Sequence, residues 1–246
     1  MTRAFILLLV LSLGQSARAG PAPTQLVKVD FVFDNKITHT LDLPTLDLQT
    51  ARKSMVTGQK VSSDQLRALA DAGDGLAAYR YAKLLQASAK PAKAGAAAHY
   101  YAIAAYTGRA FAVGPLAKLL VAEGESYGPK LLKQCKNALT IQAMSGNAHA
   151  AQALGQMYST GAPFGRDLPQ AQHFLAMAGQ SDPAAAMKLA LVLLSDPTDA
   201  ALDHAGARAA LTLAAQGTTS LSAKVTALNL LHLLDKPATL ATKDAP

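Results

Sequence analysis

The residue types that most often catalyse reactions or bind metals are few in this sequence and widely spaced. No two histidines lie within four residues of each other, so no helix offers a ready pair of metal ligands; those considered are His99, His149, His173, His204 and His232. The only cysteine, Cys135, has no histidine nearby to activate it and is predicted to be a small buried residue. Phosphate-binding loops, dinucleotide-binding glycine patterns and zinc-protease motifs are absent from the sequence. We therefore expect no catalytic residues, no metal and no cofactor, and hence not an enzyme.

Aromatic residues in the first half of the chain suggest another kind of chemistry, the binding of a partner. Tyrosine combines a large apolar ring with a polar hydroxyl and is enriched in protein interfaces. The candidates are Tyr79, Tyr81, Tyr100, Tyr101, Tyr106, Phe111 and Tyr127. Two interpretations stay open: these side chains are exposed on a binding face, or Tyr81, Tyr101 and Phe111 are large core residues between helices.

A repeated helical element must position these residues. Half of the chain is hydrophobic, and the excess is Ala and Leu, which favours helices. Five similar segments follow each other at spacings of 35, 38, 35 and 37 residues, beginning at Gly73, Gly108, Gly146, Ser181 and Thr218. Between them lie further stretches with helical periodicity, at 91–107, 128–145, 168–179 and 202–216. One helix pair cannot bury both its apolar faces, so the pattern predicts an all-α solenoid of about five helix-turn-helix repeats.

Small and acidic residues mark the predicted ends and contacts of these helices. A helix that ends in a left-handed residue favours glycine there, and this role is predicted for Gly73, Gly108, Gly146 and Gly217. Asp167 and Asp182 each precede a helix with an early proline and are predicted N-caps. Several alanines are expected to let helices approach closely: Ala97, Ala98, Ala104, Ala150, Ala153, Ala176 and Ala178.

The first 19 residues predict a secretory signal peptide. Arg3 supplies a positive start, residues 4–13 form an apolar core, and the small residues at 17 and 19 predict cleavage after Ala19. A ten-residue helix reaches only about 15 Å, roughly half a bilayer. We expect a periplasmic or secreted protein with no membrane span in the mature chain. Loss of Arg3 and Arg18 lowers the net charge from +7 to +5, and the basic residues are too scattered to predict nucleic-acid binding.

One repeat carries a recognisable pattern of residues. Residues 146–182 resemble the Sel1-like repeat, a relative of the tetratricopeptide repeat, with the pattern at Leu154, Gly155, Tyr158, Gly161, Asp167, Ala171 and Ala178 and with Phe174 at the expected aromatic position. The resemblance covers about residues 62–235, although the other repeats keep the period and lose several of these residues. It implies an adaptor or regulator. The branch with paired cysteines is not matched, whereas the size and the leader fit periplasmic regulators that restrain a membrane sensor kinase.

The segments on either side of the array follow other patterns. Residues 20–61 are predicted to hold an N-terminal hairpin and a capping helix: apolar and polar residues alternate over 26–43, as in a β-hairpin, and a degenerate helix pair follows at 46–56 and 64–71, with Ser63 as an N-cap. A lone hairpin is marginal, so it either caps the array or pairs with the sheet edge of a partner. Residues 236–246 are predicted to be a disordered tail.

These observations favour an exported scaffold that binds a protein or peptide partner of the cell envelope through the groove of the solenoid. The aromatic residues place the expected site in its N-terminal half. The alternative is a structural envelope component that contacts peptidoglycan or polysaccharide. The absence of tryptophan from the sequence weakens this alternative, because carbohydrate sites usually use exposed rings for stacking.

Overall fold

The computed structural model describes residues 37–88, 93–195 and 204–235. Within these ranges the chain forms eleven α-helices and no strand. The helices are α1 (Leu46–Val56), α2 (Ser63–Asp71), α3 (Gly75–Ala87), α4 (Ala94–Tyr106), α5 (Val113–Glu123), α6 (Pro129–Met144), α7 (Ala148–Thr160), α8 (Leu168–Gly179), α9 (Pro183–Leu194), α10 (His204–Gly217) and α11 (Leu221–Asp235). The all-α prediction is confirmed for this part of the chain. The predicted signal peptide, the first arm of the hairpin and the predicted tail lie outside the described residues.

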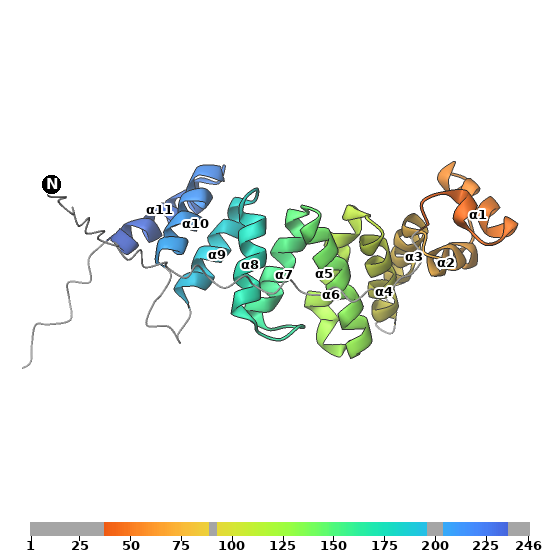
Figure 1. Ribbon diagram of the computed structural model, residues 1–246, viewed down its shortest axis with the longest axis horizontal. Helices are drawn as coiled ribbons and strands as arrows, with labels where there is room; N and C mark the ends of the chain where they lie inside the picture. Colours follow the sequence, from red (N-terminus) through yellow and green to blue (C-terminus); the bar gives the residue numbers. More distant parts are fainter. Residues whose placement is uncertain (1–36, 89–92, 196–203, 236–246) are drawn as a thin grey trace, which may run out of the picture.

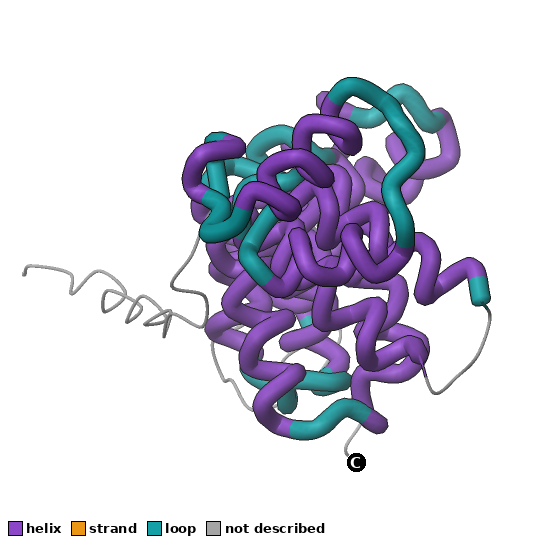
Figure 2. The backbone as a smooth tube through the Cα atoms, turned by 90° about the vertical axis from the view of Figure 1, so that its right-hand side faces the viewer, coloured by secondary structure: helices purple, strands orange, loops and turns teal. Residues whose placement is uncertain are grey.

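The helices are stacked side by side into an elongated array. Figure 1 shows them following one another along the long axis, from α1 at one end to α11 at the other. The view along that axis in Figure 2 shows the successive helices lying behind one another. Each helix packs on its neighbours in the chain, and alternate helices also touch, since α4 contacts α6, α5 contacts α7 and α7 contacts α9. This arrangement is consistent with the predicted α-solenoid.

Glycines close three equivalent turns of the array. Gly73, Gly108 and Gly146 have φ angles of 98°, 95° and 87°, so the predicted left-handed helix ends are confirmed. In the last of these turns the N–H of Gly146 donates to Ala143 O and the next N–H donates to Gln142 O. Gly217 differs, because it is the last residue of α10 and is not among the glycines with positive φ. A Cβ there would come within 2.7 Å of Pro183 Cγ, so close packing explains this glycine and the predicted turn is wrong.

Short polar side chains cap the N-termini of most of the helices. The predicted N-caps are confirmed at Asp167, which accepts from Gln170 N, and at Asp182, which accepts from Ala184 N. The predicted cap Ser63 is wrong by one residue. Ser62 accepts from Gln65 N while the Gln65 side chain accepts from Ser62 N, and this capping box fixes the start of α2 one residue earlier.

The segment before α1 corrects the predicted hairpin. Its second arm was expected as a strand up to residue 43, but Thr40–Asp42 form a 3-10 helix. The Asp42 carboxylate accepts from the backbone N–H groups of Thr38 and His39, at 3.0 and 2.7 Å, which favours a local turn over a strand. These N–H groups, His39 first, also lower the pKa of Asp42. Ile37 and Leu43, only 8% and 2% exposed, belong to the core of the array.

The apolar core is divided into two clusters. The larger runs from Ile37 to Ala185 and therefore from the first helices into the start of α9. The smaller one lies among α9, α10 and α11 and consists of Ala186, Ala190, Ala210, Leu211, Ala214, Ala215 and Ala227. Helix α4 is the most enclosed element, since all of Tyr100 to Tyr106 are buried.

No helix in the described part of the chain is both long enough and apolar enough to cross a membrane.

Candidate binding groove

The residues that carry the resemblance to the Sel1-like repeat have packing and turn roles in α7 and α8. Leu154, Ala171 and Ala178 are fully buried. A Cβ at Gly155 would lie 2.6 Å from Leu175 Cγ, so only glycine lets α8 approach α7 this closely. Tyr158 stacks on Phe174, with ring centroids 6.0 Å apart and planes 5° apart. Gly161 ends α7 with a φ of 93°.

Four of the seven candidate aromatic residues lie in the core and are not exposed. Tyr100, Tyr101, Tyr106 and Tyr127 are at most 8% exposed. The Tyr100 hydroxyl donates to Asp71 Oδ1 at 2.7 Å and the Tyr101 hydroxyl donates to Gln86 Oε1 at 2.8 Å. Burial raises the pKa of Tyr100, Tyr101 and Tyr127 to about 12. The expected exposure of these four side chains is therefore wrong, and for Tyr101 the core interpretation is confirmed.

The other three aromatic residues are partly accessible. Tyr81 is half-buried and meets Tyr100 edge to face at 4.8 Å. Tyr79 is half-buried and contacts Phe111 edge to face, with centroids 4.5 Å apart. Phe111 is 50% exposed, so its interpretation as a core residue is wrong. Lys83 Nζ lies 5.9 Å from the centre of the Tyr79 ring, so a cation of the protein itself lies over this ring.

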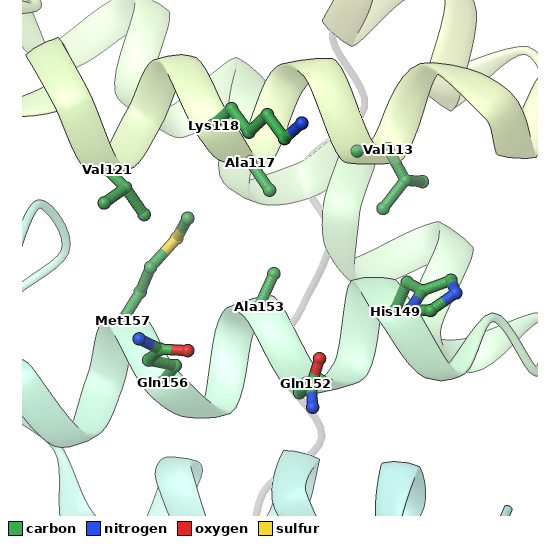
Figure 3. Close-up of a pocket in the computed structure, with 10 residues that line it drawn as sticks. Val113, Ala117, Lys118, Val121, His149, Gln152, Ala153, Gln156 and Met157 are labelled. Carbon is green, nitrogen blue, oxygen red and sulfur yellow. The ribbon is translucent and has the colours of Figure 1, made fainter. Parts of the chain in front are cut away.

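An apolar groove lies between α5 and α7, beyond these aromatic residues. Figure 3 shows Val113, Ala117 and Val121 of α5 pointing toward α7, and Ala153 and Met157 of α7 pointing back toward α5. The residues recur at helical spacing, so each helix turns one continuous stripe toward the groove. The cavity has a volume of about 500 Å³, within the range of about 300–1,000 Å³ typical of ligand pockets.

Small side chains keep this groove open. Gly114 and Ala117 on α5 face Ala153 on α7, and a Cβ at Gly114 would meet no atom within 4 Å. Helix α5 also packs mainly on α4 and α7 and makes few contacts with α6, whereas α3, α7 and α9 pack extensively on the helix that follows them. The groove between α5 and α7 is open because the side chains at Gly114, Ala117 and Ala153 are small.

Polar groups border the apolar stripe. Lys118, His149, Gln152 and Gln156 complete the lining, and Figure 3 places them along the two helices. Gln152 Nε2 donates to Asp182 Oδ2 at 2.8 Å, and the ammonium group of Lys188 donates to Gln156 Oε1 at 2.9 Å. Two amides of α7 are thus held from α9, and each has one polar atom engaged within the protein.

The groove was missed in the sequence because no motif marks it. Its residues come from two repeats and are small or aliphatic, which is also what a helix core requires. Ala153 was expected to allow close helix contact, but it is half-buried and lines the groove, and Ala176 is exposed. The expectation is confirmed for the other alanines, which are fully buried. The sequence signal that could have indicated the groove is the small size of three residues in two helices, Gly114, Ala117 and Ala153.

Reactive groups do not gather at the groove. Cys135 is fully buried as predicted, and burial raises the pKa of its thiol to about 12. The thiol contacts Ala98 O, 4.0 Å from the sulfur. Among the described residues no three His, Cys, Asp or Glu side chains are placed to hold a metal ion.

Comparisons with protein-family models, with curated proteins and with solved structures find no match to this chain.

Proposed function

We propose that this chain is an exported scaffold of Sel1-like type, a periplasmic adaptor or regulator, that binds a peptide segment of a protein partner. The observation that carries the proposal is the open apolar groove between α5 and α7. Its stripe from Val113 to Val121 covers eight helical steps, or about 12 Å, which suits a segment of about four extended residues.

The groove has the composition of a recognition site. Its floor is formed by Val113 and Met157, which are almost fully buried, and Val121 at one end is 69% exposed. Apolar side chains that enter would be removed from water, and this burial contributes about 25 cal/mol per Å². The polar groups at the edge can accept or donate hydrogen bonds to the backbone of a bound segment.

Filling the groove tests the proposal directly. Random dodecapeptides on phage are selected against the full chain, and the peptides that are enriched are measured by fluorescence anisotropy. The variant Ala153→Phe places a ring between the two helices, so we expect at least a ten-fold rise in Kd. The matched control Ala176→Phe carries the same change on the exposed face of α8 and is expected to bind like the parent protein.

Two results would refute this function. The first is a selection that yields no peptide above the background of empty phage. The second is a set of peptides that bind Ala153→Phe as well as the parent protein, which would place the binding surface elsewhere. Circular dichroism of both variants shows whether the helices remain intact, so a folding defect is told apart from a blocked groove.

A further inference from the structure

We infer that the segment held in the α5–α7 groove is acidic as well as apolar, with carboxylates that face Lys118 on the α5 side and Lys188 on the α7 side. The inference rests on the proposed peptide-binding function and adds the chemical class of the partner. It is carried by the charges around the groove.

The lining of the groove contains no acidic residue. Of its ten residues, Lys118 and His149 can carry positive charge and the others are neutral. Lys118 is exposed, and among the described residues no ion pair to it is found. Its ammonium group lies along α5 beside Ala117, at the edge of the apolar stripe.

A second lysine, from α9, lies at the α7 side of the groove, across from Lys118. Lys188 donates to the amide oxygen of Gln156, a lining residue, and this neutral acceptor leaves its charge uncompensated. The carboxylate at the start of α9, that of Asp182, is half-buried and already accepts hydrogen bonds. It caps α9 by accepting from Ala184 N and also accepts from Gln152 Nε2. An acid at a helix N-terminus is already stabilised by the helix dipole.

Charge complementarity therefore selects among apolar peptides. A Lys–carboxylate pair at an exposed site contributes about two- to five-fold in affinity, and a lysine in the peptide would be repelled by a similar factor. The contribution weakens with salt, since the Debye length falls from about 10 Å at 0.1 M to about 3 Å at 1 M. Affinity that comes from apolar burial alone does not weaken as the salt concentration rises.

The test compares the number of acidic and basic residues in the peptides that bind the groove. From the random dodecapeptide selection we keep those whose binding is lost in Ala153→Phe, and we expect Asp and Glu to exceed Lys and Arg among them. The tightest binder is then compared with a version that carries Asn or Gln at its acidic positions. We expect the neutral version to bind the parent protein five- to ten-fold more weakly in 0.1 M salt, and by less than two-fold in 1 M salt.

Charge reversal in the protein supplies the second arm. The double variant Lys118→Glu/Lys188→Glu is expected to bind the acidic peptide with an affinity at least ten-fold lower than that of the parent protein. The control Lys53→Glu/Lys60→Glu makes the same change in net charge at exposed residues of the α1–α2 region. Its affinity for the acidic peptide is expected to fall by less than two-fold.

Three outcomes would overturn the inference. Groove-dependent peptides without an acidic excess would leave peptide binding in place and show that the partner is not acidic. An equal loss in the lysine variant and in the control would assign the effect to net charge and not to the groove. If no groove-dependent peptide is selected, the proposed function and this inference fail together.

Discussion

Removing the Asp74 carboxylate should destabilise the N-terminal end of the array far more than removing an ordinary helix cap. Asp74 is 1% exposed and accepts from Arg52 Nε at 2.6 Å, and Arg52 is 12% exposed. The other carboxylate oxygen accepts from Leu76 N and Ala77 N at the start of α3. Arg52 also donates to Thr40 Oγ1 and Thr38 O, so one ion pair joins α1, α3 and the segment before α1.

The magnitude follows from what Asp74→Ala leaves behind. Loss of the cap costs about 1 kcal/mol, and an almost buried guanidinium without its carboxylate costs about 3–5 kcal/mol. Arg52 keeps two oxygen acceptors, so we expect about 4 kcal/mol in total. Asn147 is the matched control because it follows Gly146 as Asp74 follows Gly73 and caps α7 through Ala150 N with no cation beside it. Asn147→Ala should cost about 1 kcal/mol for the cap and up to about 1 kcal/mol more for the 3.3 Å hydrogen bond from its amide to Gln142 Oε1.

Urea unfolding followed by circular dichroism gives the total loss, and hydrogen exchange measured by mass spectrometry locates it. In Asp74→Ala the amides of α1 to α3 should exchange faster, while those of α7 and α8 should keep their protection. Asp74→Asn, which retains the cap and loses the charge, should fall between the two alanine variants. Equal losses in Asp74→Ala and Asn147→Ala would refute the reasoning, because the ion pair would then contribute nothing beyond a cap.

Three further predictions concern buried groups and glycines. Gly155→Ala should lower the free energy of unfolding in urea by about 1 kcal/mol, since its Cβ would meet Leu175 at 2.6 Å. Gly114→Ala, where a Cβ meets no atom, should instead raise it by about 1 kcal/mol. Equal effects of the two substitutions would contradict the close contact at Gly155. Cys135 should resist iodoacetamide at pH 8.5 and react once urea unfolds the chain, because its thiol is fully buried with a pKa of about 12, and rapid labelling of the folded protein would refute this. The Tyr100, Tyr101 and Tyr127 phenols stay protonated up to a pKa of about 12 in the fold but ionise near 10 when unfolded. Unfolding free energy should therefore be unaffected by these phenols below pH 10 and fall as the pH rises from 10 to 12, with absorbance at 295 nm following their ionisation; early ionisation in the folded protein would count against their burial.

Much of the helical architecture could be predicted from the sequence because its determinants are local. The predicted stretch at 168–179 coincides with α8, whose start is fixed by the Asp167 cap and whose composition is strongly helical. The turn glycines Gly73, Gly108 and Gly146 were identifiable from their spacing, since glycine recurs at the start of three successive repeats and adopts the left-handed conformation there.

The errors have physical causes that the sequence does not display. Alternation over residues 37–43 predicted a strand, but one carboxylate, that of Asp42, satisfies two backbone N–H groups and bends the chain. The aromatic residues of α4 could not be assigned to a face, because a helix that is apolar all round has no periodicity to reveal which side is exposed. The groove depends on the distance between two helices from different repeats, and no sequence period encodes that distance.

The division of the core has a consequence for how the molecule comes apart. The small cluster among α9, α10 and α11 consists mostly of alanines and contains one fully buried leucine, Leu211, so it holds these helices with much less apolar surface than the main cluster. In a linear array the terminal helices unfold locally before the rest, and the more weakly packed end has the lowest free energy of local unfolding. The last helices can then be released and trimmed by a protease while α5 and α7 stay together. The groove near the centre is shielded from such loss by the repeats that flank it.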